Sequence, residues 1–233
     1  MATTLVVAGG PLAGGTITDA LSGVDPDRVI AADSGLHALQ REGLHCDLVI
    51  GDMDSVGAAS LAAADAAGTV LQRHPRDKDA TDLELALETA CERSDGSAMG
   101  DRVLVVASGA GRLDHLLATV ALVGSPRWAP WSLEVHMGRT RILPVHASRV
   151  IRAPLGSTVS LLALHGGASG VTTEGFRWPL RRATLGPEST RGVSNIIEAD
   201  PARVEVREGT LTVCVPDTTP EARPRTTDQE DIS

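Results

Sequence analysis

The sequence predicts an α/β protein: a Rossmann-like domain built on a mostly parallel sheet, followed by a smaller all-β sandwich or barrel domain. In the first half, short apolar segments alternate with segments of helical spacing, the pattern of a parallel sheet covered on both faces. In the second half, short β-type segments alternate with Gly- and Pro-containing turns, as in antiparallel sandwiches. We therefore expect one domain at residues 1–128 and a second at residues 132–216. Residues 217–233 are almost free of apolar side chains, which predicts a disordered tail.

The expected strands of the first domain are apolar runs that end at turn-forming residues. They cover residues 5–8, 29–32, 47–50, 69–71 and 103–107. Apolar residues recur at helical spacing in residues 36–41, 81–92 and 116–123, and Thr81 or Asp82 can cap the second of these helices. The expected strands of the second domain cover residues 133–136, 158–164, 193–197, 204–207 and 211–215.

The bulk composition excludes several classes of protein. The formal net charge is −9 over 233 residues, which argues against broad nucleic-acid or anionic-membrane binding. No apolar stretch approaches the roughly 20 residues of a membrane span. Cys46, Cys91 and Cys214 lack zinc-like spacing, and such dispersed cysteines fit reduced thiols in a cytoplasm. The sequence therefore predicts a cytoplasmic protein without nucleic-acid or membrane partners.

Acidic residues follow the expected strands of the first domain. Asp52 and Asp54 stand two positions apart just after the third strand, so both can reach one cation. Mg²⁺ prefers carboxylate oxygens together with substrate phosphate oxygens. A plain surface turn is the alternative, since Asp, Gly and Ser are turn formers. The loops after parallel strands share one edge of the sheet, and there we expect Asp33, Asp52, Asp54, Asp82, Arg112 and Asp114 to gather.

Two further segments suit phosphate binding. Lys78 is the only lysine of the chain, and it opens the segment Lys78-Asp79-Ala80-Thr81-Asp82, which ends at an expected helix N-terminus. Helix N-termini attract phosphate through free N–H groups. Gly111 and Arg112 could let the backbone approach a phosphate and grip its oxygens. Taken singly, the two segments are also explained by a capping turn and by a helix entry with a surface ion pair.

Taken together, these segments resemble the thiamine pyrophosphokinase family. The motifs occur in the family's order: residues 32–35 resemble Ala-Asp-Gly-Gly, 51–55 are Gly-Asp-x-Asp-Ser, 78–82 are Lys-Asp-x-Thr-Asp and 111–115 are Gly-Arg-x-Asp-His. Residues 175–180 and 191–195 continue the match, so the resemblance runs from about residue 5 to 215. The chain departs from the family at Ser34, His37 and Ala110, but no carboxylate is lost.

The resemblance implies transfer of a pyrophosphoryl group from ATP to the hydroxyethyl oxygen of thiamine, giving thiamine diphosphate and AMP. It also implies Mg²⁺ as cofactor and a homodimer whose active sites are shared between subunits. The implied catalytic residues are Asp33, Asp52, Asp54 and Asp82, and Mg²⁺ would be held by Asp52, Asp54 and Asp82. The implied ATP and phosphate contacts are Lys78, Asp79, Thr81, Gly111 and Arg112. The implied thiamine contacts are Asp114, His115, Trp178, Ser194 and Asn195.

Alternatives remain open from the sequence. The substrate could be another heterocycle, such as a hydroxymethylpterin, and the segments around Trp178 and Ser194 favour thiamine over it. The chain could instead be a non-catalytic nucleotide or thiamine-diphosphate sensor, although the complete set of carboxylates speaks against this. Trp178 itself could simply fill the core of the second domain.

Overall fold

The computed structural model describes residues 1–92 and 101–217. The tail expected at residues 217–233 therefore lies outside the described residues, apart from Asp217. In the described part of the chain, no helix has both the length and the apolar character needed to cross a membrane.

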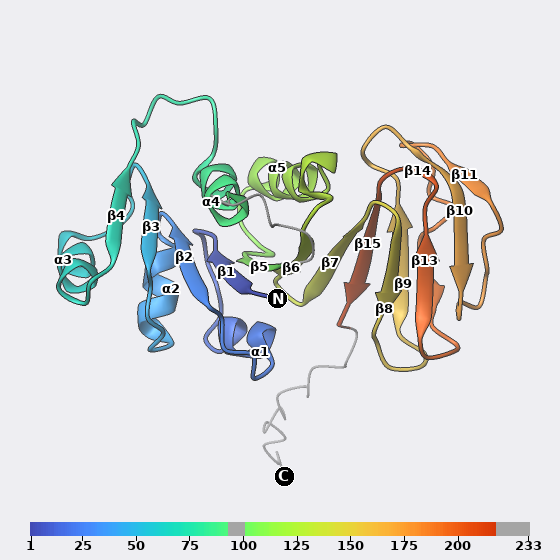
Figure 1. Cartoon of the computed structure of the whole chain (residues 1–233), viewed down its shortest axis with the longest axis horizontal. Helices are drawn as coiled ribbons and strands as arrows, with labels where there is room; N and C mark the ends of the chain where they lie inside the picture. The colour runs from blue at the N-terminus through green and yellow to red at the C-terminus, as the bar shows by residue number, and fades with distance from the viewer. Residues whose placement is uncertain (93–100, 218–233) are drawn as a thin grey trace, which may run out of the picture.

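The first part of the chain forms six neighbouring parallel strands (Figure 1). In chain order they are β1 (Thr3–Val7), β2 (Arg28–Ala32), β3 (Leu48–Gly51), β4 (Val70–Arg73), β5 (Arg102–Ala107) and β6 (Ser132–Met137). Their order across the sheet is β6-β5-β1-β2-β3-β4. The chain therefore moves outward from β1 to β4 and then returns to the other side of β1. This reversal creates a switch point between β1 and β5.

Helices cover both faces of these strands, as the continuous apolar strand sequences require. One face packs against α1 (Thr16–Leu21), α2 (Gly35–Arg41) and α3 (Ala58–Ala66). The other face packs against α4 (Asp82–Cys91), the end of α5 (Leu113–Val123) and the short 3-10 helix Pro126–Trp128. The strand and helix pattern predicted for the first half is thus confirmed, although α1 and α3 were not expected.

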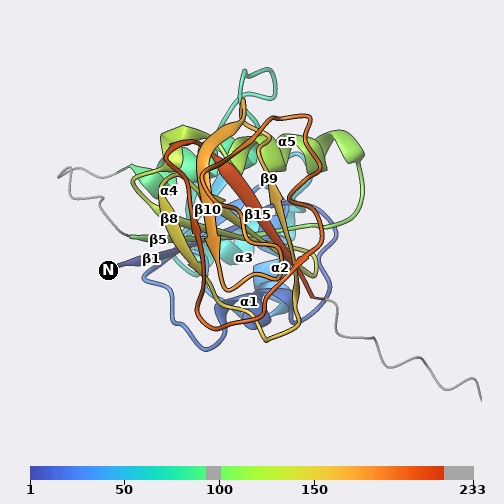
Figure 2. The same cartoon turned by 90° about the vertical axis from the view of Figure 1, so that its right-hand side faces the viewer.

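The second part of the chain is a sandwich of two antiparallel layers at one end of the molecule (Figures 1 and 2). One layer contains β7 (Thr140–Val145), β15 (Leu211–Pro216), β9 (Thr158–Leu162) and β12 (Asn195–Ile196). The other contains β8 (Ser148–Ile151), β13 (Ala202–Glu205), β10 (Ala168–Glu174) and β11 (Ala183–Leu185), with β14 (Glu208–Gly209) beside β10. An α/β part followed by a β part is therefore confirmed.

The two parts share one sheet. β6 was expected in the second domain, but it pairs in parallel with β5 and antiparallel with β7. The first layer of the sandwich therefore continues the parallel sheet into a single ten-stranded sheet. The division into residues 1–128 and 132–216 remains a prediction, because hydrogen-bonded strands run across it. The position of β6 follows from its connection: α5 and the 3-10 helix form a crossover, which returns the chain parallel to β5.

Arg149 bridges β6 and β7, where the shared sheet changes from parallel to antiparallel pairing. The ladder between β6 and β7 ends at the pair Val135 and Ile142, so the two strands separate beyond it. There the Arg149 guanidinium donates to the carbonyl oxygens of Leu133 at 2.6 Å and Pro144 at 3.1 Å. Arg149 thus satisfies carbonyls that the interrupted ladder would leave unpaired.

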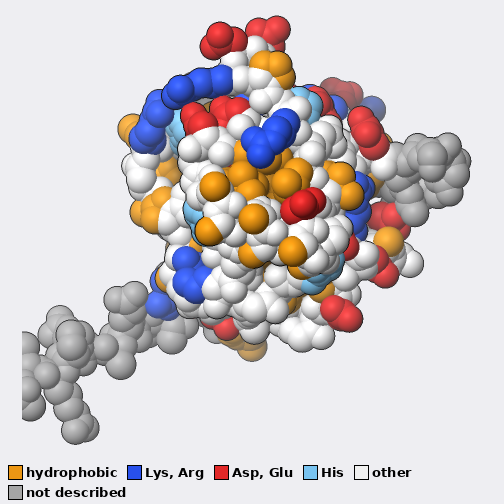
Figure 3. Space-filling view, turned by 90° about the vertical axis from the view of Figure 1, so that its left-hand side faces the viewer, with side chains coloured by type: hydrophobic (Ala, Val, Ile, Leu, Met, Phe, Trp, Pro, Cys, Tyr) orange, Lys and Arg blue, Asp and Glu red, His pale blue; other side chains and the backbone are white. Residues whose placement is uncertain are grey.

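The opposite end of the molecule is formed by α3 and the edge strand β4. Figure 3 views this end and shows apolar side chains at its centre, with charged side chains around them. The alanines on the outer side of α3 are exposed, and so is Val70 on β4. The edge is short, four residues, which limits strand-to-strand association with another chain.

Candidate active site

The expected site residues of the first half lie at the carboxyl edge of the parallel strands. A cavity of about 480 Å³ opens at the switch point between β1 and β5. Its lining comes from the residues after β1, β2 and β5, from the start of α4 and from one side of α5 along most of its length. In open α/β sheets, ligands bind in the crevice at such a switch point.

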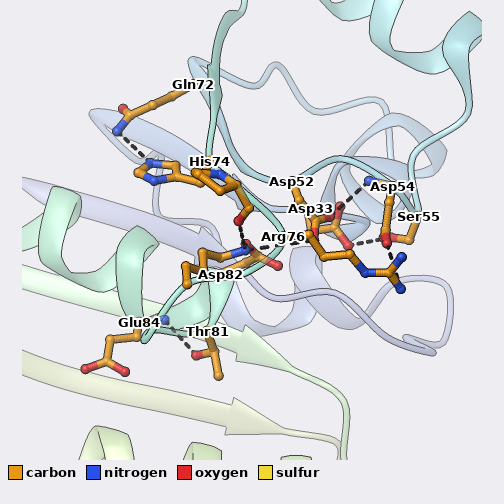
Figure 4. A network of polar contacts seen from close by, with 12 residues as sticks. Asp33, Asp52, Asp54, Ser55, Gln72, His74, Arg76, Thr81, Asp82 and Glu84 are labelled. Carbon is orange, nitrogen blue, oxygen red and sulfur yellow. Dashed lines mark hydrogen bonds and ion pairs between the residues drawn. The ribbon is translucent and has the colours of Figure 1, made fainter.

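Three carboxylates meet at this edge. Asp33 follows β2, Asp52 follows β3 and Asp82 opens α4. Each offers one carboxylate oxygen, and these three oxygens all lie within 4.8 Å of one another. We call Asp33, Asp52 and Asp82 the carboxylate cluster (Figure 4). Residues separated by up to 49 positions are thus brought to one point by the order of the strands.

Lys78 is the cation nearest to the carboxylate cluster. Its Nζ lies 3.1 Å from Asp82 Oδ1 and 3.9 Å from Asp52 Oδ2, and it also donates to the Pro75 carbonyl at 3.2 Å. Burial raises the pKa of Asp82, and the Lys78 ammonium opposes this rise. The backbone N–H of Asp54 lowers the pKa of Asp52. One ammonium beside three carboxylates leaves the site able to attract a further cation.

Asp54 points away from the carboxylate cluster. Its backbone N–H donates to Asp52 Oδ1 at 3.0 Å, whereas its carboxylate lies 3.5 Å from Arg76 Nη2. Asp33 takes the place near Asp52 and Asp82 that the sequence assigned to Asp54. The Ser55 hydroxyl donates to Asp33 Oδ2, while Asp33 Oδ1 is buried and accepts no hydrogen bond within the described residues (Figure 4). Ser55 and Arg76 were not expected to contact site residues.

The backbone at this site is constrained. Asp33 and Met53, which separates the two aspartates of its loop, both have positive φ angles, 48° and 62°. Non-glycine residues seldom adopt this conformation, and it is concentrated at functional sites. Gly51 has φ 147°, and a Cβ there would lie 2.9 Å from Asp82 Oδ1. The absence of a side chain at Gly51 therefore lets β3 approach the Asp82 carboxylate.

Thr81 begins the helix that carries Asp82. Its hydroxyl accepts a hydrogen bond from the Glu84 N–H at 3.2 Å, so the predicted cap is confirmed. Thr81 and Asp82 both line the cavity, whereas Asp79 is exposed in the loop before them. The free N–H groups of the first turn of α4 thus lie beside the cavity.

Arg112, Asp114 and His115 lie at the start of α5. Arg112 binds Asp114 through two contacts, Nη2 to Oδ2 at 2.6 Å and Nε to Oδ1 at 3.2 Å. Gly111, Arg112 and His115 line the cavity, and all of them are exposed. The hydrogen bond from Arg112 lowers the pKa of Asp114. Four predicted residues, Gly111, Arg112, Asp114 and His115, therefore gather at the start of α5, beside the cavity that Asp33 and Asp82 also line.

The remaining predicted residues form a second group on the sandwich. The Asn195 side chain pairs with Trp178: Oδ1 accepts the Trp178 N–H at 3.2 Å, and Nδ2 donates to its carbonyl at 2.8 Å. Ser194 has a positive φ of 59°, and its N–H donates to Ser160 Oγ at 3.1 Å. The Trp178 side chain is 57% exposed, so it does not fill the core as the alternative required. No contact among the described residues joins this group to the carboxylate cluster.

Carboxylates at the switch point of a parallel sheet, beside a helix N-terminus and a cationic loop, are typical of enzymes that transfer phosphoryl groups. Comparison with known proteins identifies the family. A sequence model described as "Thiamin pyrophosphokinase, catalytic domain" matches residues 25–128. A second, "Thiamin pyrophosphokinase, vitamin B1 binding domain", matches residues 146–211. The chain belongs to the thiamine pyrophosphokinase family.

Individual relatives agree with this assignment. The thiamine pyrophosphokinase of Bacillus subtilis is 26% identical over 204 residues, which are 84% of this chain and 89% of that protein. The crystal structure of a thiamine pyrophosphokinase from the same organism has a TM-score of 0.76 at 22% identity, covering 92% of this chain and 98% of that chain. The enzyme of Candida albicans has a TM-score of 0.75 at 13% identity, covering 92% and 89%. The fold is thus similar even where little sequence is shared.

Proposed function

We propose that this protein transfers the pyrophosphoryl group of ATP to the hydroxyethyl oxygen of thiamine. The observation that carries the proposal is the meeting of Asp33, Asp52 and Asp82 at the switch-point cavity, in a chain of the thiamine pyrophosphokinase family. The thiamine oxygen forms a bond to the β-phosphorus, and the bond from that phosphorus to the oxygen bridging it to the α-phosphorus breaks. AMP leaves with the bridging oxygen, and the hydroxyl proton passes to a base.

The chain's own residues would position the phosphates and balance their charge. Lys78 is held by the carboxylate cluster, and Arg112 stands at the rim of the same cavity. In phosphoryl transfer, catalysis is mainly positioning and electrostatic stabilisation of charge on phosphate oxygens. We assign these two cations to the phosphates, together with Thr81, Gly111 and the first turn of α4. We assign the hydroxyl proton to Asp33, because its Oδ1 has no hydrogen-bond donor among the described residues, whereas Asp82 lies beside the Lys78 ammonium and Asp52 accepts the Asp54 N–H.

The residues present fit a divalent cation, which we take to be Mg²⁺. The oxygens of Asp33, Asp52 and Asp82 have the spacing of shared ligands, and carboxylates are the oxygen donors that Mg²⁺ prefers. When bound, Mg²⁺ neutralises charge on the phosphate oxygens. Asp54 was expected as a ligand and stays a candidate, although its carboxylate faces Arg76 in this structure.

We infer that the six parallel strands form a Rossmann-like sheet that binds the nucleotide. The order β4-β3-β2-β1-β5-β6 has the same reversal beside its first strand as the doubly wound order 3-2-1-4-5-6, with one more strand at the first edge and one fewer parallel strand at the other. In sheets of this kind, nucleotides lie across the carboxyl ends of the strands at the reversal. We therefore place ATP across the residues that follow β1 and β5.

We propose that thiamine binds between two subunits of a homodimer. The group formed by Trp178, Ser194 and Asn195 carries no contact to the carboxylate cluster of its own chain. Trp178 presents an exposed ring, and an aromatic face suits a flat cationic ligand. The sandwich of one subunit could then complete the cavity of its partner.

The surface of α5 supports an interface beside the cavity. Of its eleven residues, only Val123 is buried. Leu113 and Leu117 are 67% and 61% exposed, and both belong to the helix that lines the cavity. Contiguous exposed apolar residues of this kind mark interaction sites.

The three cysteines are free thiols in the structure, which agrees with the cytoplasmic setting expected from the sequence.

The decisive experiment is a direct measurement of products. Purified protein, ATP, thiamine and Mg²⁺ should give equal amounts of AMP and thiamine diphosphate. A panel of other hydroxylated heterocycles, including a hydroxymethylpterin, tests the alternative substrate class. Binding of nucleotide or thiamine diphosphate without AMP release would instead identify a sensor and overturn the proposal.

A further inference from the structure

The switch-point cavity is lined by four serine and threonine side chains, and one of them has no hydrogen-bond partner among the described residues. The other three are used within the fold: Thr81, Ser108 and Thr119. The first accepts a backbone N–H, and the other two donate to backbone carbonyl oxygens. The fourth is Ser34, a half-buried residue whose hydroxyl does not cap the helix α2 that follows it. The Ser34 hydroxyl is therefore available to a ligand of the cavity.

The backbone around Ser34 is held in place by the sheet. The N–H of Asp33 donates to the carbonyl oxygen of Ile50 at 2.9 Å, which ties this turn to β3. On the other side of Ser34, Gly35 packs directly against β1, because a Cβ there would lie 2.1 Å from the carbonyl oxygen of Val7. The fold thus determines the position of the Ser34 side chain before any ligand binds.

The Ser34 hydroxyl lies against Gly9, in the loop that follows β1. A Cβ at Gly9 would lie 2.7 Å from Ser34 Oγ, and the next nearest atoms would be 3.6 Å away. The hydroxyl therefore occupies the space that a side chain at residue 9 would need. Both residues line the cavity, and Asp33 of the carboxylate cluster directly precedes Ser34. The hydroxyl is thus next to the turn that carries Asp33 and to the loop across which we place ATP.

We infer that the Ser34 hydroxyl, from its position against Gly9, donates a hydrogen bond to a phosphate oxygen of ATP. The inference rests on the proposed function, which places the nucleotide in this cavity. Hydrogen bonds to charged oxygens are the stronger ones, and a donor that the fold already holds in place loses little freedom on binding. Residue 34 is also a position at which the chain departs from the family's motif. The contact would therefore be an addition of this chain to the shared site.

The test is direct binding of ATP by the full chain, measured by calorimetry with ATP and Mg²⁺ in the absence of thiamine. Ser34→Ala should weaken ATP binding by about tenfold, as expected for one lost hydrogen bond to a charged group. Its unfolding midpoint without ligand should equal that of the parent chain, because the hydroxyl has no partner among the described residues. Ser132→Ala is the matched control, since it removes an exposed hydroxyl that does not line the cavity, and it should bind ATP as the parent chain does.

A change at Gly9 tests the position of the hydroxyl. The Cβ of Gly9→Ala would displace Ser34 Oγ, whereas its other contacts would be ordinary ones. In a chain that already carries Gly9→Ala, Ser34→Ala should therefore cause no further loss of ATP binding, whatever Gly9→Ala costs by itself. A further tenfold loss in the double variant would overturn the inference, because the hydroxyl would then act from another position.

Inorganic tripolyphosphate with Mg²⁺ identifies the part of ATP that the hydroxyl contacts. It has the phosphate chain of ATP without the nucleoside, so Ser34→Ala should weaken its binding by the same factor. A loss confined to ATP would place the hydroxyl at the nucleoside and overturn the inference. Equal ATP binding by the parent chain and Ser34→Ala would overturn the inference alone, whereas a parent chain that binds no ATP would overturn the proposed function as well.

Discussion

Only some of the contacts made by the side chains of the carboxylate cluster could be predicted from their spacing in the sequence. Asp52, Asp82 and Lys78 could be predicted, because acids after successive parallel strands must meet at one edge. The contact between Ser55 and Asp33 could not, since it depends on the positive φ angles that turn the two loops toward each other. The same turn geometry directs Asp54 outward, which its position two residues from Asp52 did not indicate.

Asp52 offers the most direct test of the cluster. Asp52→Asn keeps the shape of the side chain and removes its charge, so we expect AMP formation to fall by at least about 100-fold, as when one strong electrostatic group is lost from an active site. Calorimetry should show weaker binding of Mg²⁺ in the same variant. The unfolding midpoint should change little, because little apolar area is involved.

Asp77→Asn is the matched control for Asp52→Asn. Asp77 is exposed in the loop that carries Lys78, and it belongs to neither the cluster nor the cavity lining. Near-normal turnover of Asp52→Asn at saturating Mg²⁺, or an equal loss in Asp77→Asn, would contradict the role given to the cluster.

The lowered pKa of Glu134 predicts how the free energy of unfolding depends on pH. Burial alone would raise this pKa, but the His136 hydrogen bond and the charges of Arg141 and Arg102 lower it from its ordinary value of 4.5 to about 2 in the folded protein. A depressed carboxyl pKa contributes stability that is fully present above the unfolded pKa and is lost as pH falls through the folded value. Glu134→Gln should therefore lower the free energy of unfolding at pH 7 and flatten its decline between about pH 4.5 and 2. Denaturant unfolding at a series of pH values checks this, with Glu205→Gln, an exposed glutamate on β13, as control.

At the scale of the elements, the strands that carry site residues were the most predictable. Each is a continuous apolar run bounded by turn formers, so its burial on both faces can be predicted from the sequence. α3 was missed because its alanines give no apolar stripe, although alanine is the strongest helix former. β7 was missed because Pro144 argues against a central strand. Pro144, which has no N–H to donate, is tolerated there because β6 pairs with β7 only up to Ile142, so no β6 carbonyl lacks a donor on its account.

The cap of α4 links one element to the site. Thr81→Ala removes the acceptor for the Glu84 N–H, and loss of such a cap costs about 1 kcal/mol of stability. Urea unfolding should show this loss, while Thr81→Ser, which keeps the hydroxyl, should restore most of it. If Thr81→Ala were as stable as the parent chain, the hydroxyl would not be stabilising the helix.

For the whole molecule, the sequence indicated two kinds of structure but not how they join. A change from continuous apolar strands to short β segments is visible, yet strand pairing across the change is not a local property of the sequence. β6 could be assigned to the first sheet only from its parallel register with β5. The same limit applies to the thiamine group: its residues were predicted as part of the site, and the fold leaves them on the sandwich, without contact to the carboxylate cluster.

The composite site gives the last prediction. If Trp178 of one subunit stacks on thiamine held at the cavity of its partner, Trp178→Ala should raise the thiamine KM by about ten- to 100-fold, the range of one lost aromatic stack. The KM for ATP should hardly change, because ATP would lie at the carboxyl edge of the parallel strands. Asp52→Asn subunits and Trp178→Ala subunits, each impaired alone, should then regain activity when mixed at low thiamine concentration. Each heterodimer would pair an intact carboxylate cluster from one chain with an intact Trp178 from the other. Coexpression with two different affinity tags isolates such heterodimers, and Asp52→Asn homodimers treated identically are the control. Unchanged thiamine KM in Trp178→Ala would refute the stacking role, and proven heterodimers without recovered activity would refute the shared site.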